Sequence, residues 1–269
     1  MKETAIDFLK GLVIGSINVI PGVSGGTMAV ILGIFEKLTE SISCFVGAAR
    51  AKKLQYVKFL AAVGIGMAIG IVTFTNIVLY FLTRWPRATA VVFILMVLPS
   101  IPLIVKGLDK KDPKNIGFFV LGLILTGIFV FLDARYGAGE ASVGAPVAVT
   151  AAYCVKMLLC GAVAAGAMII PGISGSLILL ILGEYHHIIG FVGDLAKLPA
   201  LLGAFPGLSA FARELHLIPV FFFGIGVLLG LVFVAKLLNF LLRKYKGPTL
   251  FFITGLVIVS LYQIWLKLS

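Results

Sequence analysis

Two near-copies of one short motif hold the residues best suited to chemistry. The chain reads NVIPGVSGGT over residues 18–27 and MIIPGISGS over residues 168–176. In each copy Pro-Gly-x-Ser-Gly interrupts an apolar run, although proline and glycine are unfavourable inside a helix. A helix that restarts after such a break presents backbone N–H groups and hydroxyls, which bind anions and above all phosphate. We therefore predict a phosphate-binding pair of tips made of Asn18, Pro21, Gly22, Ser24, Gly25, Gly26, Thr27, Pro171, Gly172, Ser174, Gly175 and Ser176.

Ionisable residues near the apolar runs form a second set of candidates. Glu36 follows the first motif, while Glu184 and His186 follow the second, with His186 at the position equivalent to Glu36. These groups are either solvated helix ends or coupling groups that bind H⁺ or Na⁺. No other cofactor is expected.

Three basic residues allow two interpretations each. Arg84 and Arg87 are interfacial anchors or contacts for a lipid headgroup. Lys236 lies inside an apolar run, where it either snorkels to the interface or lines a cavity and meets an anion.

The composition identifies the class of protein that must position these residues. The chain is 61% hydrophobic and only 12% charged, about half the charge of an average soluble domain. We predict an all-α polytopic membrane protein, because backbone in hydrocarbon must satisfy its own hydrogen bonds. The net charge of +11 indicates basic cytoplasmic loops and anionic headgroups rather than nucleic acid. The spacing of Cys44, Cys154 and Cys160 does not suggest a metal site, and we expect packing roles.

Five apolar runs are long enough to cross a bilayer. They are Tyr56–Thr83, Ala88–Lys106, Ile116–Leu132, Ile218–Leu242 and Thr249–Leu266. The two broken segments, about Ile6–Phe35 and Tyr153–Ile189, are either long broken spans or re-entrant hairpins with arms of about a dozen residues, roughly 18–20 Å.

The charges of the loops favour the hairpins. Three basic loops, at 50–58, 106–114 and 243–246, fall on one side of the membrane if both broken segments re-enter, whereas the loop at 243–246 moves to the other side if both cross. Basic loops are cytoplasmic, so we predict a multi-pass membrane protein with its N-terminus inside and its C-terminus outside.

An internal repeat supports this topology. Residues 21–33 match residues 171–183 at seven of 13 positions, and Gly64, Gly66 and Gly70 recur as Gly224, Gly226 and Gly230. We expect those glycines to serve helix packing. One integral membrane domain, 1–269, would contain repeat 1 (about 6–106), a linking span (about 116–132) and repeat 2 (about 153–267). An odd number of spans separates the tips, so the repeats would be inverted, as in many secondary transporters.

The pair NVIPGVSGGTMAVILGIFEKL and MIIPGISGSLILLILGEY resembles the bacterial polyprenyl-phosphate transporter family, formerly a domain of unknown function. The resemblance covers nearly the whole chain. It implies a flippase that returns undecaprenyl phosphate across the cytoplasmic membrane for reuse in cell-envelope synthesis, with a possible homo-oligomer. One departure occurs at Gly183-Glu184-Tyr185-His186, where family members tend to read Gly-x-Tyr-Glu.

Two rival functions share parts of this pattern. Undecaprenyl-pyrophosphate phosphatases have a Pro-Gly-x-Ser-Arg-Ser tip whose arginine stabilises the transferring phosphoryl group. Here Gly25 and Gly175 occupy the arginine position, so we predict that the protein is not an enzyme. An ion-coupled transporter of small anions would use the same tips and remains an alternative.

Overall fold

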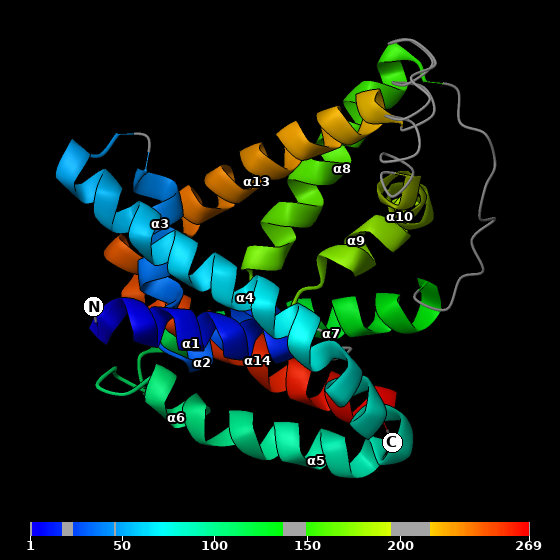
Figure 1. Cartoon of the computed structure of the whole chain (residues 1–269). Helices are drawn as coiled ribbons and strands as arrows, with labels where there is room; N and C mark the ends of the chain where they lie inside the picture. The colour runs from blue at the N-terminus through cyan, green and yellow to red at the C-terminus, as the bar shows by residue number, and fades with distance from the viewer. Residues whose placement is uncertain (1, 18–23, 46, 137–148, 195–215, 269) are drawn as a thin grey trace. The chain divides into compact units, whose positions relative to one another are not determined.

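Every regular element that the structure describes is a helix (Figure 1). The computed structural model describes residues 2–17, 24–45, 47–136, 149–194 and 216–268. These residues form two compact units, each assembled from segments that are distant in sequence.

Unit 1 contains most of the first half of the chain and the C-terminal helix. Its elements are α1 (Lys2–Ile17), α2 (Gly25–Ile31), α3 (Phe35–Cys44), α4 (Arg50–Arg84), α5 (Pro86–Val97), the 3-10 turn η1 (Leu98–Ser100), α6 (Ile101–Ile104), α7 (Pro113–Tyr136) as far as Val130, the segment Met168–Ser174, the end of α13 from Phe233, and α14 (Lys246–Leu268).

The core of unit 1 lies around α14. Ile253, Leu256 and Val257 of this helix are at most 1% exposed. Glycines bring α7 and α14 together, because a Cβ added at Gly122 or Gly255 would overlap a backbone carbonyl oxygen of the other helix. α14 is therefore the central helix of this unit.

The packing of α1 along α4 depends on glycines in the same way (Figure 1). An added Cβ at Gly66 would overlap the Phe8 carbonyl oxygen, and one at Gly70 would overlap that of Leu12. Gly64 has no atom within 4 Å of the added position. The prediction that these glycines serve close packing is thus confirmed for Gly66 and Gly70 and wrong for Gly64.

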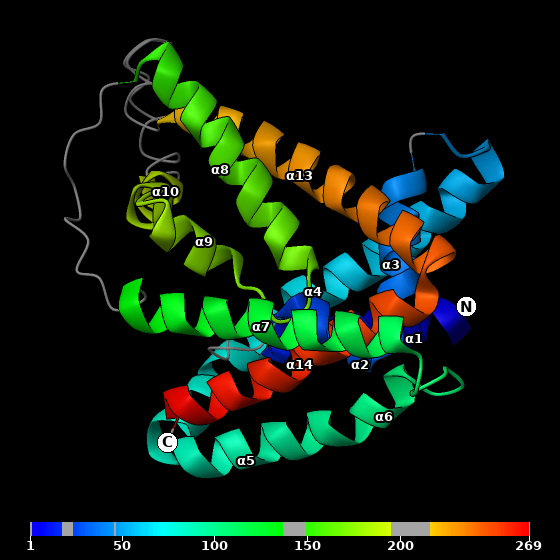
Figure 2. The same ribbon diagram turned by 180° about the vertical axis from the view of Figure 1, so that it is seen from behind.

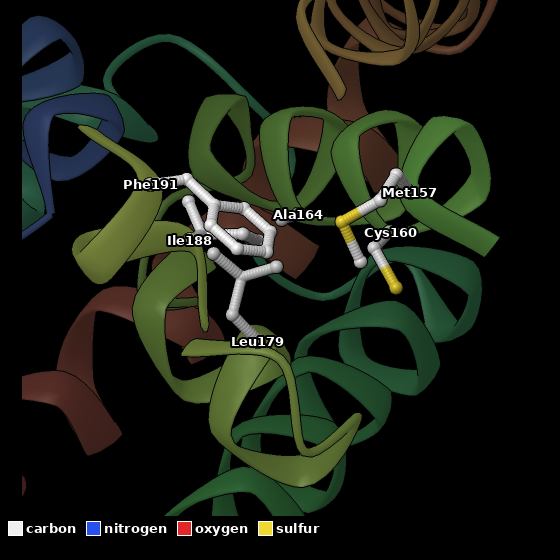
Figure 3. Packing of buried hydrophobic residues seen from close by; sticks show 6 residues of the cluster. All are labelled: Met157, Cys160, Ala164, Leu179, Ile188 and Phe191. Atoms are coloured by element: carbon white, nitrogen blue, oxygen red, sulfur yellow. The ribbon is translucent and has the colours of Figure 1, made fainter. Parts of the chain in front are cut away.

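Unit 2 consists of α7 from Phe131, α8 (Ala151–Ile169) as far as Ala167, α9 (Gly175–Ile181), α10 (Tyr185–Asp194) and α13 (Leu217–Lys244) as far as Val232. Figure 2 shows α9 and α10 beside α8. Met157, Cys160 and Ala164 of α8 form a buried cluster with Leu179, Ile188 and Phe191 of α9 and α10 (Figure 3). Cys160 is therefore a packing residue, as predicted.

Among the described residues, five helices are long and apolar enough to cross a membrane, which supports a multi-pass all-α membrane protein. Four correspond to predicted spans, at Arg50–Phe74, Pro113–Arg135, Leu217–Lys244 and Lys246–Leu266. The fifth is α8, whose 19 residues extend about 28 Å and exceed the dozen expected for a hairpin arm.

The predicted span Ala88–Lys106 is not one helix. It is divided into α5, the turn η1 and the four-residue α6. Pro99 lies within the 3-10 turn and Pro102 within α6. Proline lacks the N–H that an α-helix needs and clashes with the preceding turn, so this division has a local cause.

Both broken segments contain the expected helix break. α1 ends at Ile17 and α2 begins at Gly25, while α8 ends at Ile169 and α9 begins at Gly175. Each short helix has seven residues and ends on a glycine with positive φ, Gly33 at +67° and Gly183 at +74°.

The two short helices also end in the same hydrogen bonds. Ile34 N–H donates to the Ala29 carbonyl, and at the equivalent place in the second motif Glu184 N–H donates to the Leu179 carbonyl. Together with the glycine N–H bonds to Val30 and Leu180, this is the Schellman arrangement that ends a helix on a left-handed residue. The two short helices thus end in the same backbone conformation.

Candidate functional site

The first tip places two hydroxyls at the start of α2. Ser24 is extended, with φ −95° and ψ 148°, and caps the helix by accepting the Thr27 N–H on its Oγ at 3.2 Å. The Ser24 and Thr27 hydroxyl oxygens lie 2.9 Å apart. Serine is a favoured N-cap because its oxygen satisfies an otherwise unpaired backbone donor.

The second motif meets the first within unit 1. Gly172 N–H donates to Ser24 Oγ at 3.2 Å and to Thr27 Oγ1 at 3.0 Å. Gly172 adopts φ +81°, a left-handed conformation that only glycine takes readily. One N–H of the second motif is therefore shared between two hydroxyls of the first.

Two glycines of the meeting motifs lie close to neighbouring backbone, Gly26 to the second motif and Gly172 to α14. A Cβ added at Gly26 would lie 2.6 Å from the Ile169 carbonyl oxygen, and one at Gly172 would lie 2.9 Å from that of Leu256. Pro171 is among the most buried residues of the described chain. Neither position therefore has room for a Cβ, and at Gly172 the positive φ favours glycine as well.

The remaining predicted tip residues divide into two groups. Ser174 ends the unit 1 segment, while Gly175 and Ser176 are the first residues of α9 in unit 2. Asn18, Pro21 and Gly22 lie outside the described residues. The described meeting point therefore consists of Ser24, Gly26, Thr27, Pro171 and Gly172.

This meeting point offers hydroxyls and backbone donors. Neither tip contains a lysine or arginine, and the described residues contain no cluster of His, Cys, Asp and Glu suited to a metal ion. Such a set can hydrogen-bond phosphate oxygens. Transfer of a phosphoryl group requires in addition a fixed cation to stabilise the developing charge.

Glu36 lies at a surface ion pair rather than in a buried site. Its carboxylate is 2.9 Å from Lys246 Nζ, and both side chains are more than half exposed. His186 makes an edge-on contact with the Tyr185 ring, with 5.1 Å between ring centres. Neither residue contacts the meeting point through a described hydrogen bond.

Glu184, by contrast, is the centre of a buried polar cluster in unit 2. Its side chain is only 3% exposed. It accepts hydrogen bonds from Tyr153 Oη at 2.9 Å and from Lys156 Nζ, and lies 3.1 Å from His187 Nδ1. We call Tyr153, Lys156, Glu184 and His187 the Glu184 cluster.

The sequence interpretation named Glu184 but missed Tyr153 and Lys156. A signal was present, because Lys156 is a single lysine inside the apolar stretch of α8, and intramembrane charges are rare and paired. The partner could not be identified until the packing of α8 and α10 was known.

The three remaining basic candidates lie on exposed surfaces. Arg84 ends α4 and Arg87 lies in the first turn of α5. Lys236 is exposed on α13, on a surface shared with Phe233 and Phe240, which are 70% and 52% exposed. This placement favours snorkelling along a lipid-facing surface over a cavity.

Comparison with known proteins provides relatives of nearly full length. The polyprenyl-phosphate transporter of Vibrio cholerae serotype O1 is 30% identical over 268 residues, covering 96% of this chain and 76% of the relative. The polyprenyl-phosphate transporter of Staphylococcus aureus is 28% identical over 261 residues, covering 97% and 86%. Both are named as transporters and not as enzymes, in agreement with the prediction. No solved structure matches the chain.

A family described as undecaprenyl phosphate translocase-like matches residues 14–268. The match includes both Pro-Gly-x-Ser-Gly motifs, the meeting point and the Glu184 cluster. The chain belongs to this undecaprenyl phosphate translocase-like family.

Proposed function

We propose that the protein is a flippase for undecaprenyl phosphate in the bacterial cytoplasmic membrane, serving carrier-lipid recycling in cell-envelope synthesis. Family membership and the names of both relatives support a polyprenyl-phosphate substrate. The observation that carries the proposal is the meeting of Ser24 and Thr27 with Gly172 N–H. It gathers phosphate-binding groups from both motifs at one place in a chain rich in apolar helices.

In this proposal the phosphate competes with the contacts between the tips. Ser24 Oγ and Thr27 Oγ1 now accept the Gly172 N–H. A phosphate oxygen is a stronger acceptor than a hydroxyl because it is charged. It would take over the Gly172 N–H, and the two hydroxyls would then donate to the phosphate. Asn18, Pro21, Gly22, Gly25, Ser174, Gly175 and Ser176 would complete the two tips.

We also propose that the chain contains two inverted repeats with re-entrant tips. The order of elements supports this, because α1, α2 and α3 correspond in turn to α8, α9 and α10. In the same way α4 and α5 correspond to α13 and α14. The same glycine packing occurs between α8 and α13, where Gly226 approaches Leu158 and Gly230 approaches Ala162.

Coupling to H⁺ or Na⁺ through Glu36 or His186 would provide a driving force. Glu36 is more than half exposed beside Lys246, so an ion can reach it from the aqueous phase. Substitution of Glu36 with Gln should then change the dependence of transport on the ion gradient without changing transport at equal concentrations on both sides.

The direct test is transport of undecaprenyl phosphate in liposomes that contain the purified full chain, followed by accessibility of the phosphate to an external reagent. We expect faster exchange between leaflets than in empty liposomes. Unchanged exchange, or release of phosphate from the pyrophosphate form, would contradict the proposal. Acceleration of free phosphate uptake instead of lipid exchange would favour a transporter of small anions.

A matched pair of variants tests the role of the meeting point. Thr27→Val removes a hydroxyl at constant shape from a residue that is 2% exposed, and we expect transport to fall about tenfold or more, as for the loss of a hydrogen bond to a charged group. Thr254→Val is the control, since Thr254 is 4% exposed and its hydroxyl binds only the Leu250 carbonyl of its own helix at 2.7 Å. Equal transport by both variants would exclude the Thr27 hydroxyl from the site.

A further inference from the structure

An open groove of about 670 Å³ follows the contact between α1 and α4 in unit 1. Thr4, Ala5 and Phe8 line it from the first turns of α1, and Lys58, Ala61 and Ile65 line it from α4. Ala62 also lines it and is buried at 7% exposure. The groove is thus apolar along most of its length, with a hydroxyl and a cation among its lining residues.

The polar lining of the groove suits an anion. Lys58 is exposed and has no ion-pair partner among the described residues. It belongs to the basic start of α4, together with Arg50, Lys52 and Lys53. The exposed hydroxyl of Thr4 is available from α1. A lysine ammonium and a hydroxyl are suitable ligands for a phosphate.

The apolar lining suits one hydrocarbon chain. Ala5 and Ala61 leave space, while Ile65, at 56% exposure, extends the apolar surface along α4. A polyprenyl phosphate has one tail and a phosphomonoester with a charge near −2. A glycerophospholipid has two tails, and only one could occupy a single groove.

The second half of the chain lacks these features. At the positions equivalent to Lys58 and Ala61 it has Ile218 and Phe221. Phe222 replaces Ala62 and packs against the buried cluster of unit 2. The equivalent positions of α13 thus hold large apolar side chains and no lysine, so close packing of the two helices alone does not explain the small residues and lysine of the groove.

We propose that this groove is a docking site for the polyprenyl phosphate at the membrane surface, with the phosphate on Lys58 and Thr4 and the tail along Ala61 and Ile65. The inference rests on the proposed function and adds a second binding site for the lipid. α1 connects the two sites, because the groove lies at its first two turns and the first Pro-Gly tip follows its last turn. From Thr4 to Ile17 the helix rises about 20 Å.

The test is photolabelling of the full chain in phosphatidylethanolamine nanodiscs with a diazirine-bearing polyprenyl phosphate, followed by mapping of the labelled peptides. We expect label on residues 4–8 and 58–65. Ala61→Phe should remove this label, because it introduces the ring that occupies the equivalent position in the second half. Val72→Phe, at a position that is 78% exposed on the same helix, should not.

The charge is tested separately. Lys58→Gln should lower labelling about fivefold, and Lys58→Arg should restore it, whereas Lys52→Gln should leave it unchanged. Unlabelled polyprenyl phosphate should compete with the probe, and an equal excess of phosphatidylglycerol should not. Equal competition by phosphatidylglycerol, or labelling that Ala61→Phe does not reduce, would overturn the docking site.

Liposome transport separates this inference from the proposed function. Ala61→Phe and Lys58→Gln should slow exchange at low substrate and approach the parent rate at high substrate, since they affect docking only. Normal exchange by both variants at all concentrations would reject the groove and leave the flippase proposal intact. Absent exchange by the parent chain would reject the flippase, while photolabelling would still decide whether the groove binds the lipid.

Discussion

Gly172 has conformational and spatial requirements as well as a hydrogen-bonding role. Its φ of +81° is unfavourable for any residue with a Cβ, and an added Cβ would lie 2.9 Å from the Leu256 carbonyl oxygen. Its N–H is the donor shared by Ser24 and Thr27. A single substitution therefore tests whether the meeting of the two motifs is rigid.

We expect Gly172→Ala to destabilise the protein by about 2 kcal/mol or more, from the left-handed conformation and the close contact together. Gly117→Ala is the control, because Gly117 lies in α7 with no atom within 4 Å of an added Cβ, and alanine there should be neutral or stabilising. Thermal unfolding in detergent measures both. Equal stability of the two variants would contradict a constrained Gly172.

The Glu184 cluster predicts which of two substitutions lowers the stability of the protein more. Lys156→Met leaves a carboxylate that is 3% exposed without its cation, whereas Glu184→Gln leaves a lysine that is 52% exposed and can turn to water. Removing the partner of a buried charge is the more damaging change. We expect the unfolding temperature to fall more for Lys156→Met than for Glu184→Gln, and the reverse order would show that the lysine is the dependent partner.

At the scale of residues, the sequence predicted which positions are unusual better than it predicted their partners. The paired motifs identified Ser24, Thr27 and Gly172 as a related set. The hydrogen bonds from Gly172 N–H to Ser24 and Thr27 depend on how the two motifs pack together, which side-chain types do not determine. The same is true of Lys156 and Glu184, since their pairing follows from how α8 packs against the start of α10.

At the scale of elements, two glycines on one helix provide a matched comparison. Gly66 and Gly64 lie close together in α4, but an added Cβ would overlap the Phe8 carbonyl oxygen only at Gly66. Gly66→Ala must separate α1 from α4, so we expect a loss of about 1–3 kcal/mol, in the range of overpacked cores. Gly64→Ala meets empty space and should be neutral or better.

Thermal unfolding and liposome transport of these two variants together show whether Gly66 serves helix packing alone or also transport. If Gly66→Ala lowers stability while the remaining folded protein transports normally, the glycine serves packing alone. Normal stability with lost transport would instead require α1 and α4 to move relative to each other during the cycle.

The element boundaries show where the sequence was informative. The helix break at the second Pro-Gly motif follows directly from residue types, and the structure has it. At the first motif the described part of the break is Ser24, which is extended before α2. The division of the run after Ala88 was missed, although Pro99 and Pro102 were visible in the sequence, because apolar length was weighted above the missing N–H groups. α8 is longer than the sequence predicts, because the break at Pro171 indicates two arms of similar length, whereas α8 has 19 residues and α9 has seven.

At the scale of the whole molecule, the remaining question is how the chain crosses the membrane. Five helices in the described part of the chain are long and apolar enough to span. Because α8 is one of them, helix length alone does not distinguish a re-entrant second segment from a crossing one. The loop charges favour a re-entrant second segment. Both hairpins place the loops at 50–58, 106–114 and 243–246 on one side, whereas two crossings move the loop at 243–246 to the other.

Cysteine accessibility decides between these topologies. In a background without Cys44, Cys154 and Cys160, single cysteines at Lys53, Lys110 and Lys244 report one basic loop each. If both segments re-enter, a maleimide that cannot cross membranes should label all three only after the cells are opened, because basic loops are retained in the cytoplasm. Labelling of Lys244→Cys in intact cells, with the other two protected, would mean that the second segment crosses. The two tips could then not enter the membrane from opposite sides as inverted hairpins. A different topology would have to bring Gly172 to Ser24 and Thr27.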